Sequence, residues 1–360
     1  MNNKLTIKMV VALAAIFSTA SVNAATSVDD FNLKGDYRLR YQLEDKESGT
    51  SRARTRIRFR LKGERAISEQ STVKFGLATG GTDARSTNQT LQDSFQTPDI
   101  RLDFAYIKHS LSEDFSVMGG KMKNPLWRAS DLLWDSDINP DGFAVVGKSM
   151  IEKFSFSSTV GYFVLDELKS DEEDPGLFVL QPAVSFSVAD NMKSKFSLGY
   201  YFTQNLVGNT LDNSSGSNTG ADSGLVDDFS ALVFSGQLDM NNVMGLPLVR
   251  SFGELILNSA MDDSNRGGIV GIKFGDKKVK GLGKWQAMLS YRYLEKDAWL
   301  DIFPDADSYG GATNTQGLKV GVNYGLSKAT AVGITYINMD VIDGTKNAQS
   351  IFQLDLKSKI

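Results

Sequence analysis

The 360 residues include no cysteine, so neither a disulfide framework nor a thiolate metal site can form. Histidine is nearly absent as well. A hydrolase built from this chain would have to use the one histidine, His109, next to Ser110 and a compact turn. Long apolar runs are missing too: beyond the N-terminal segment, none reaches the roughly 18 residues of a membrane helix. If the remaining chain enters a membrane, it must therefore do so as a closed β-barrel.

The N-terminal segment has the pattern of an export signal. Lys4 and Lys8 precede an apolar stretch over residues 9–17, and small residues follow up to Ala24. This predicts a secretory signal peptide over residues 1–24. Its removal takes away two lysines and no acidic residue, so the net charge changes from −4 to −6. An acidic exported chain is a poor candidate for binding nucleic acid.

One segment alternates strictly between cations and other side chains. The cations are Arg52, Arg54, Arg56, Arg58, Arg60 and Lys62, and the residues between them are Ala53, Thr55, Ile57, Phe59 and Leu61. A strand has a period of two, so one of its faces is cationic and the other is largely apolar. Each Arg or Lys that faced lipid near the midplane would cost about 2–4 kcal/mol. The pattern therefore indicates a wall between lipid and water, with the cations on the wet side.

Similar alternation recurs along the chain in about sixteen runs. A mature length of roughly 336 residues leaves about 21 for each strand and its connection, which suits 9–11 spanning residues and a turn. We therefore predict an all-β fold: a transmembrane antiparallel β-barrel of about 16 strands, formed as a single domain by residues 25–360.

The connections between the runs alternate between compact and long. The compact ones are 63–71, 110–114, 148–152, 189–193, 239–247, 275–283 and 325–329, and the links between them include 80–99, 121–141, 205–227 and 295–316. This is typical of short periplasmic turns and long outer loops. The link 205–227 is rich in Asn, Ser, Gly and Asp, which predicts a mobile surface loop.

Aromatic residues often lie near the ends of the apolar faces. Tyr37, Tyr41, Tyr106, Tyr162, Tyr200, Tyr324 and Tyr336 are candidates for aromatic girdles at headgroup depth. The alternative is that they are core aromatics of a soluble β-protein.

Two stretches resemble the putative porin family of Gram-negative outer membranes. Residues 119–142 include Lys121, Asn124, Pro125, Trp127, Arg128, Trp134, Asn139, Pro140 and Asp141, and residues 291–336 include Tyr291, Arg292, Tyr293, Phe303, Asp305, Gly317 and Tyr336. The resemblance implies a pore-forming outer-membrane barrel but no assigned substrate. The chain departs from barrels of this kind by ending in Ile360 rather than an aromatic residue, which bears on insertion by the barrel-assembly machinery.

The expected partners follow from this resemblance. They are outer-membrane lipid and lipopolysaccharide, small hydrophilic solutes or ions, and the assembly machinery, with a homotrimer expected by analogy with sixteen-stranded porins. We expect no enzyme activity, cofactor, metal or nucleic acid.

The link 121–141 is the candidate constriction of the pore. It contains Trp127, Arg128, Asp131, Trp134, Asp135, Asp137 and Asp141. Apolar rings in an exposed loop need somewhere to pack, so we expect this loop to fold into the lumen. There its acids would face a basic wall made by Arg38, Arg40, the Arg52–Lys62 row, Lys74 and Arg101. The predicted function is a water-filled channel for passive diffusion of small hydrophilic solutes and ions.

Alternatives remain open. The loop could be a surface cap, and the barrel could be a plugged structural or adhesive one or a barrel-embedded hydrolase. The basic wall favours anions, whereas the loop acids and Asp103, Glu254 and Asp355 favour cations. A calcium-like spacing at Asp135, Asp137, Asn139 and Asp141 has Pro140 and Val146 where an EF-hand needs Gly and Glu, so no metal site is predicted.

Overall fold

The computed structural model describes residues 31–169 and 173–360, and the predicted signal peptide over 1–24 lies outside them. The strands are β1 (Asn32–Lys46), β2 (Arg52–Ala66), β3 (Ser71–Thr79), β4 (Gln89–Thr90), β5 (Ile100–Ser110), β6 (Phe115–Lys121), β7 (Asp141–Ile151), β8 (Phe154–Val164), β9 (Gly176–Ala189), β10 (Met192–Gln204), β11 (Ser230–Val243), β12 (Leu246–Asn258), β13 (Arg266–Gly275), β14 (Trp285–Leu294), β15 (Thr315–Gly325), β16 (Thr330–Val341) and β17 (Gln349–Lys359). A short 3-10 helix, η2 (Tyr309–Gly311), precedes β15. Within these residues, no helix is long and apolar enough to cross a bilayer.

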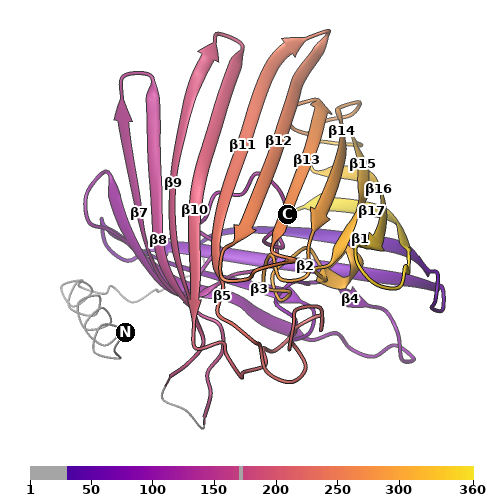
Figure 1. Cartoon of the computed structure of the whole chain (residues 1–360). Helices are drawn as coiled ribbons and strands as arrows, with labels where there is room; N and C mark the ends of the chain where they lie inside the picture. The colour runs from indigo at the N-terminus through magenta and orange to yellow at the C-terminus, as the bar shows by residue number, and fades with distance from the viewer. Residues whose placement is uncertain (1–30, 170–172) are drawn as a thin grey trace.

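The strands close into an antiparallel barrel (Figure 1). Each long strand pairs with the next along the chain, and β1 pairs with both β2 and β17, which closes the ring. The two-residue β4 pairs with β2 at Arg56 and Ile57 and continues the course of β3, so it adds no further position to the ring. The barrel therefore has sixteen strands, which confirms the predicted fold class.

The connections sort by length between the two ends of the barrel. One end carries tight turns, as between β7 and β8 or between β11 and β12, and we call it the turn end. The opposite end, the loop end, carries the long connections 80–99, 122–140, 205–229 and 295–314. Figure 1 shows the tips of the β7–β8, β9–β10 and β11–β12 hairpins standing away from these long loops. The predicted alternation of compact and long links is confirmed.

Residue parity sets the two faces of the barrel wall. On β1, Leu39 and Tyr41 are exposed on the outside, whereas Arg38 and Arg40 are only 8% and 4% exposed and face inward. The outer face of the other strands also carries exposed apolar side chains, such as Leu198, Leu232, Leu289 and Ile334. A continuous apolar belt around a polar interior is the arrangement that a lipid bilayer requires.

An outer aromatic cluster lies near the loop end of β8 to β10. The ring centroid of Tyr162 is 4.7 Å from that of Phe178, and Phe178 stacks on Phe202 at 4.7 Å. Tyr200 lies 5.8 Å from Phe202. Tyr162 and Tyr200 thus occupy the kind of position predicted for girdle residues.

Tyr106 does not belong to a girdle, so that prediction was wrong. The pairing of β3 with β5 shifts register between Gly76 and Leu77, opposite Phe104. A bulge inserts one extra residue and reverses the parity of the strand beyond it. Tyr106 consequently lines an inner cavity beside Lys62 and Lys74.

Candidate functional site in the lumen

Loop 122–140 folds into the barrel and packs there through its apolar side chains. Leu132, Leu133 and Trp134 are at most 3% exposed and belong to one apolar cluster with wall residues such as Phe163 on β8 and Tyr201 on β10. Burial of this surface from water stabilises the inward position of the loop.

Loop 295–314 also lies in the lumen and joins loop 122–140. The Trp134 ring is 4.3 Å from Phe303 and 6.1 Å from Trp299, between centroids. The Trp299 Nε1–H donates to the backbone oxygen of Leu133 at 2.7 Å, and the Asp135 N–H donates to the backbone oxygen of Phe303 at 2.7 Å. We call this contact the loop junction. Sequence reasoning missed loop 295–314 as an inward partner, although Trp299 and Phe303 in a long link gave the same signal as Trp127 and Trp134.

Loop 205–229 extends the loop layer by packing on loop 295–314. Ser214 and Ser217 donate hydrogen bonds to the Asp301 carboxylate, and Asn218 Nδ2 donates to the Trp299 backbone oxygen at 2.9 Å. Asn218 is 4% exposed. Contrary to the sequence prediction, this link is held by loop contacts, because its polar side chains satisfy buried groups of loop 295–314.

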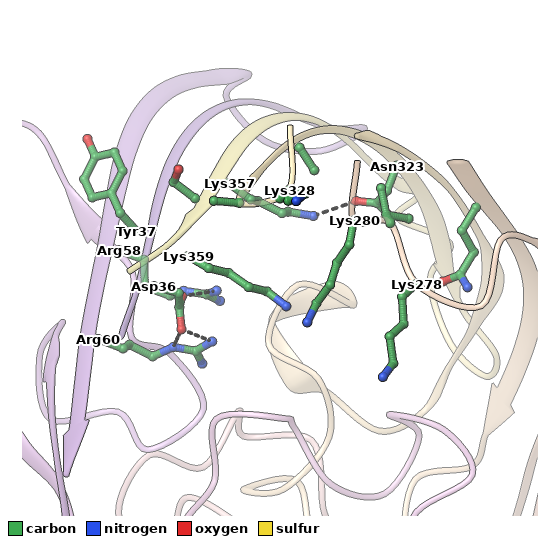
Figure 2. Close-up of a pocket in the computed structure, with 15 residues that line it drawn as sticks. Asp36, Tyr37, Arg58, Arg60, Lys278, Lys280, Asn323, Lys328, Lys357 and Lys359 are labelled. Carbon is green, nitrogen blue, oxygen red and sulfur yellow. Dashed lines mark hydrogen bonds and ion pairs between the residues drawn. The ribbon is translucent and has the colours of Figure 1, made fainter. Parts of the chain in front are cut away.

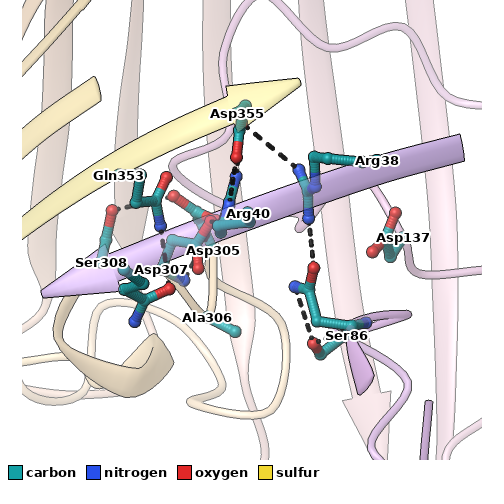
Figure 3. A network of polar contacts seen from close by, with 12 residues as sticks. Arg38, Arg40, Ser86, Asp137, Asp305, Ala306, Asp307, Ser308, Gln353 and Asp355 are labelled. Atoms are coloured by element: carbon teal, nitrogen blue, oxygen red, sulfur yellow. Dashed lines mark hydrogen bonds and ion pairs between the residues drawn. The ribbon is translucent and has the colours of Figure 1, made fainter. Parts of the chain in front are cut away.

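The basic wall is formed by two facing rows on β1 and β2. In the pairing register, Arg38 lies opposite Arg58 and Arg40 lies opposite Arg56. Like charges on directly opposed positions repel each other, so acids nearby offset that cost. Arg40 has two such acids: Nε and Nη2 donate to Asp355 on β17 at 2.7 and 3.0 Å, and Nη1 donates to Asp307 of loop 295–314 at 2.8 Å (Figure 3).

Loop acids reach the basic wall directly. Asp137 of loop 122–140 accepts from Arg60 at 3.0 Å, and Arg60 also donates to Asp36 at 3.0 Å. Lys319 on β15 lies 2.6 Å from Asp131 and 2.7 Å from Asp305. Among the loop acids and wall cations that were predicted to oppose each other, Asp137 and Arg60 are thus in direct contact, whereas Lys319 lies outside the predicted wall. At both contacts the opposite charges neutralise each other locally.

Most of the other predicted basic residues line cavities near one of the two ends of the barrel. Arg52, Arg54 and Arg56 line a cavity of about 250 Å³ toward the loop end, and Arg54 pairs with Glu44. Lys62 and Lys74 line a cavity near the turn end, where Lys74 pairs with Glu64 at 2.6 Å. Arg101 lies 3.8 Å from Asp103 and donates to the backbone oxygen of Asp83 at 2.8 Å, which ties β5 to loop 80–99.

The remaining predicted loop residues have more local contacts. The Trp127 ring lies 4.7 Å beneath the Lys195 ammonium group, and Arg128 donates to the backbone oxygen of Asp135 at 2.9 Å. Asp141 pairs with Lys121 at 2.7 Å, with its side chain 55% exposed, so it belongs to the strand ends and not to the loop junction.

The calcium-like spacing does not converge on one point. Asp135 accepts from backbone N–H groups, Asp137 accepts from Arg60 and Thr87, and the Asn139 amide donates to the Asp103 backbone oxygen. In the described ranges, no group of three or more potential metal-binding His, Cys, Asp or Glu side chains occurs.

His109, the histidine considered for hydrolysis, lies at the turn end. Its Nδ1 is 2.8 Å from the Ser71 hydroxyl, and Ser71 is 1% exposed at the start of β3. A nucleophile has to touch its substrate, and this hydroxyl is covered.

A basic vestibule occupies the turn end of the lumen (Figure 2). It consists of two adjoining cavities of about 490 and 450 Å³ that share Asp36, Arg60, Lys280 and Lys359. Lys34, Lys62 and Lys123 line the second cavity, and Lys278, Lys328 and Lys357 line the first. Sequence reasoning identified Arg58, Arg60 and Lys62 here. It missed the lysines of the β13–β14 and β15–β16 links, because the positions of turn residues do not follow from strand parity.

The loop junction should respond to pH through Asp135. Burial raises the pKa of Asp135 to about 9, and the nearby Asp305 and Asp137 carboxylates act in the same direction. Between an ordinary carboxyl pKa of about 4 and pH 9, the folded barrel then binds a proton that the unfolded chain has released. The free energy of unfolding should therefore fall as the pH rises across this window.

Denaturant unfolding at pH 5 and pH 8.5 checks this expectation. Asp135→Asn keeps a neutral side chain at both values, so the decline should be smaller in the variant than in the unmodified chain. Equal declines in both proteins would show that Asp135 does not carry the pH dependence.

Comparison with known proteins agrees with the barrel. Residues 14–234 and 210–360 match the model of a family described as putative porin. No curated protein matches the chain.

Several solved structures share the fold. OprB of Pseudomonas putida superposes with a TM-score of 0.60 at 11% identity, covering 92% of this chain and 94% of that chain. OmpT of Vibrio cholerae, described as a trimer form, gives 0.54 at 11% identity, covering 92% and 100%. OmpF of Salmonella typhi gives 0.54 at 12% identity, covering 92% and 97%. At these identities the likeness concerns the fold alone.

Proposed function

The chain belongs to the putative porin family and forms an outer-membrane channel, and we propose that this channel passes small hydrophilic solutes and ions by passive diffusion with a preference for anions. The observation that carries the proposal is the cationic row of β2, which faces the lumen beside Arg38 and Arg40 of β1. A channel wall with one sign of charge raises the local concentration of the opposite ion.

The ion pairs support an excess of positive charge along the path. Asp137 and Asp307 are each bound to a wall arginine, so each of these loop acids offsets only one cation of the wall. In the part of the chain that the structure describes, Arg52 and Arg56 form no ion pair. Farther along the lumen, toward the turn end, lies the basic vestibule. We place the constriction between the loop junction and the basic wall, where loop acids contact wall arginines.

Measurement of the zero-current potential across planar bilayers tests the preference. With a potassium chloride gradient, we expect a potential of the sign that indicates chloride preference. Swelling of liposomes in neutral sugars gives the size limit independently of charge. A potential that indicates preference for potassium would contradict the proposal, and a barrel without conductance would favour the plugged alternative.

The assembly and export of the chain belong to the same proposal. We propose a homotrimer, in line with the trimer form described for the Vibrio cholerae protein, and export directed by the signal peptide over residues 1–24. Lipopolysaccharide and lipid would cover the apolar belt. Ile360 exchanges backbone hydrogen bonds with Gly35 at 3.1 and 3.0 Å, so the last residue pairs at the seam of the barrel.

We propose no catalytic role for His109 and Ser71. Their hydrogen bond joins the ends of β3 and β5 beside the compact turns, and the covered Ser71 hydroxyl offers no access to a substrate.

A further inference from the structure

We propose that the basic vestibule is a binding site for small organic anions that carry two or more negative groups, an inference that rests on the proposed anion-preferring channel. Each of its two cavities, about 490 and 450 Å³, falls within the usual size of ligand pockets. The vestibule therefore has the volume to hold a small molecule, in addition to letting ions pass.

The charges of the vestibule are strongly unbalanced. Its cations outnumber its acids, Asp36 and Asp103, and these two acids are already paired with Arg58, Arg60, Arg101 and Lys123. Six further lysines form no ion pair in the described part of the chain: Lys34, Lys62, Lys278, Lys280, Lys328 and Lys359. Like charges held together at this density repel one another unless an anion lies between them.

The unpaired lysines approach from different sides of the lumen. Lys359 comes from β17, whereas Lys280 comes from the β13–β14 link, and both line both cavities. Figure 2 shows the two side chains extending their ammonium groups toward the same region, with Lys278 pointing into the same space. A multivalent anion can contact both sides at once, whereas a monovalent one can neutralise only one ammonium group.

Uncharged polar groups complete the lining. Gln286, Asn323 and Ser358 line the first cavity, and Lys357 Nζ donates to Asn323 Oδ1 at 3.0 Å. Amide and hydroxyl groups can bond to hydroxyl or further oxygen atoms of a ligand. The chemistry fits polycarboxylates and phosphorylated compounds, both of which present several oxygen acceptors and more than one charge.

Inhibition of the ion current by anions added on one side provides the test. Citrate and tripolyphosphate serve as multivalent probes, acetate as the monovalent control and raffinose as the neutral control, all at equal ionic strength. We expect saturable block by the multivalent probes at lower concentration from the turn end than from the loop end. Block by citrate alone or by tripolyphosphate alone would narrow the class to carboxylates or to phosphates.

The variant Lys280→Gln with Lys359→Gln should raise the half-blocking concentration at least tenfold. Both side chains are exposed to the lumen, so the barrel should fold normally, which heat-modified gel mobility verifies. Lys153→Gln with Lys169→Gln removes two exposed charges from other links and should leave the block unchanged. Equal block by citrate and acetate, or the same half-blocking concentration in the vestibule variant, would overturn the proposal.

Calorimetric titration of citrate into the detergent-solubilised barrel separates this proposal from the proposed function. Saturable binding that the double variant loses would support the site even if the channel showed no anion preference. Absence of binding in a channel that does prefer anions would overturn the site and leave the proposed function intact.

Discussion

Replacing Arg54, Arg56 and Arg58 together by glutamine is expected to shift the channel severalfold toward cations. The change removes three positive charges from the inner row of β2. It also leaves Glu44 without its ion-pair partner Arg54, and it removes one of the two arginines that pair with Asp36, which keeps Arg60. Both effects make the potential in the lumen more negative. The zero-current potential in a potassium chloride gradient measures the shift.

A control variant with the same change in net charge distinguishes loss of the basic row from a general loss of positive charge. Lys153→Gln, Lys169→Gln and Lys346→Gln also remove three positive charges, from exposed positions on links between strands. This variant should retain the selectivity of the unmodified channel, because charges that are fully exposed to the solution are screened by salt. Unchanged selectivity in the arginine variant would show that the basic row does not line the conducting path.

The fold was accessible from the sequence because its main signal is local. Alternation with a period of two marks each strand without any knowledge of its neighbours, and the interruption of that pattern marks the links. The predicted link 121–141 begins and ends where β6 ends and β7 begins. A one-residue bulge invalidates this reasoning, as at Tyr106, which lies beyond the register shift opposite Gly76. After the bulge, each later side chain of the strand faces the side opposite to the one that parity predicts.

The site was less accessible because its contacts connect distant parts of the chain. Arg40 was recognised as a wall residue, but its partners Asp307 and Asp355 lie 267 and 315 residues away in sequence. Strand parity gives the face on which a side chain lies and not the partner that reaches it from a loop. The inward direction of loop 122–140 could be inferred from its tryptophans, which need apolar surroundings. Its contact with loop 295–314 could be found only from the three-dimensional structure.

Trp299→Ala is expected to release the loop junction and to raise the single-channel conductance. Trp299 is fully buried, with its ring centroid 5.3 Å from Tyr201 and 5.5 Å from Phe303, and its Nε1–H bonds to Leu133. Truncation of a buried aromatic side chain costs about 3–5 kcal/mol. Because the barrel strands keep their own hydrogen bonds, this loss should fall mainly on the loops that fill the lumen.

Two measurements separate opening of the pore from general damage to the protein. Limited proteolysis should cut loops 122–140 and 295–314 faster in the variant, while the gel mobility of the folded barrel stays unchanged. Trp127→Ala is the matched control, because Trp127 lies on the same loop, is only partly buried and contacts Lys195 rather than the junction. Faster proteolysis without any rise in conductance would mean that the loop junction does not limit the flow of ions, and the constriction would then have to lie elsewhere along the basic wall.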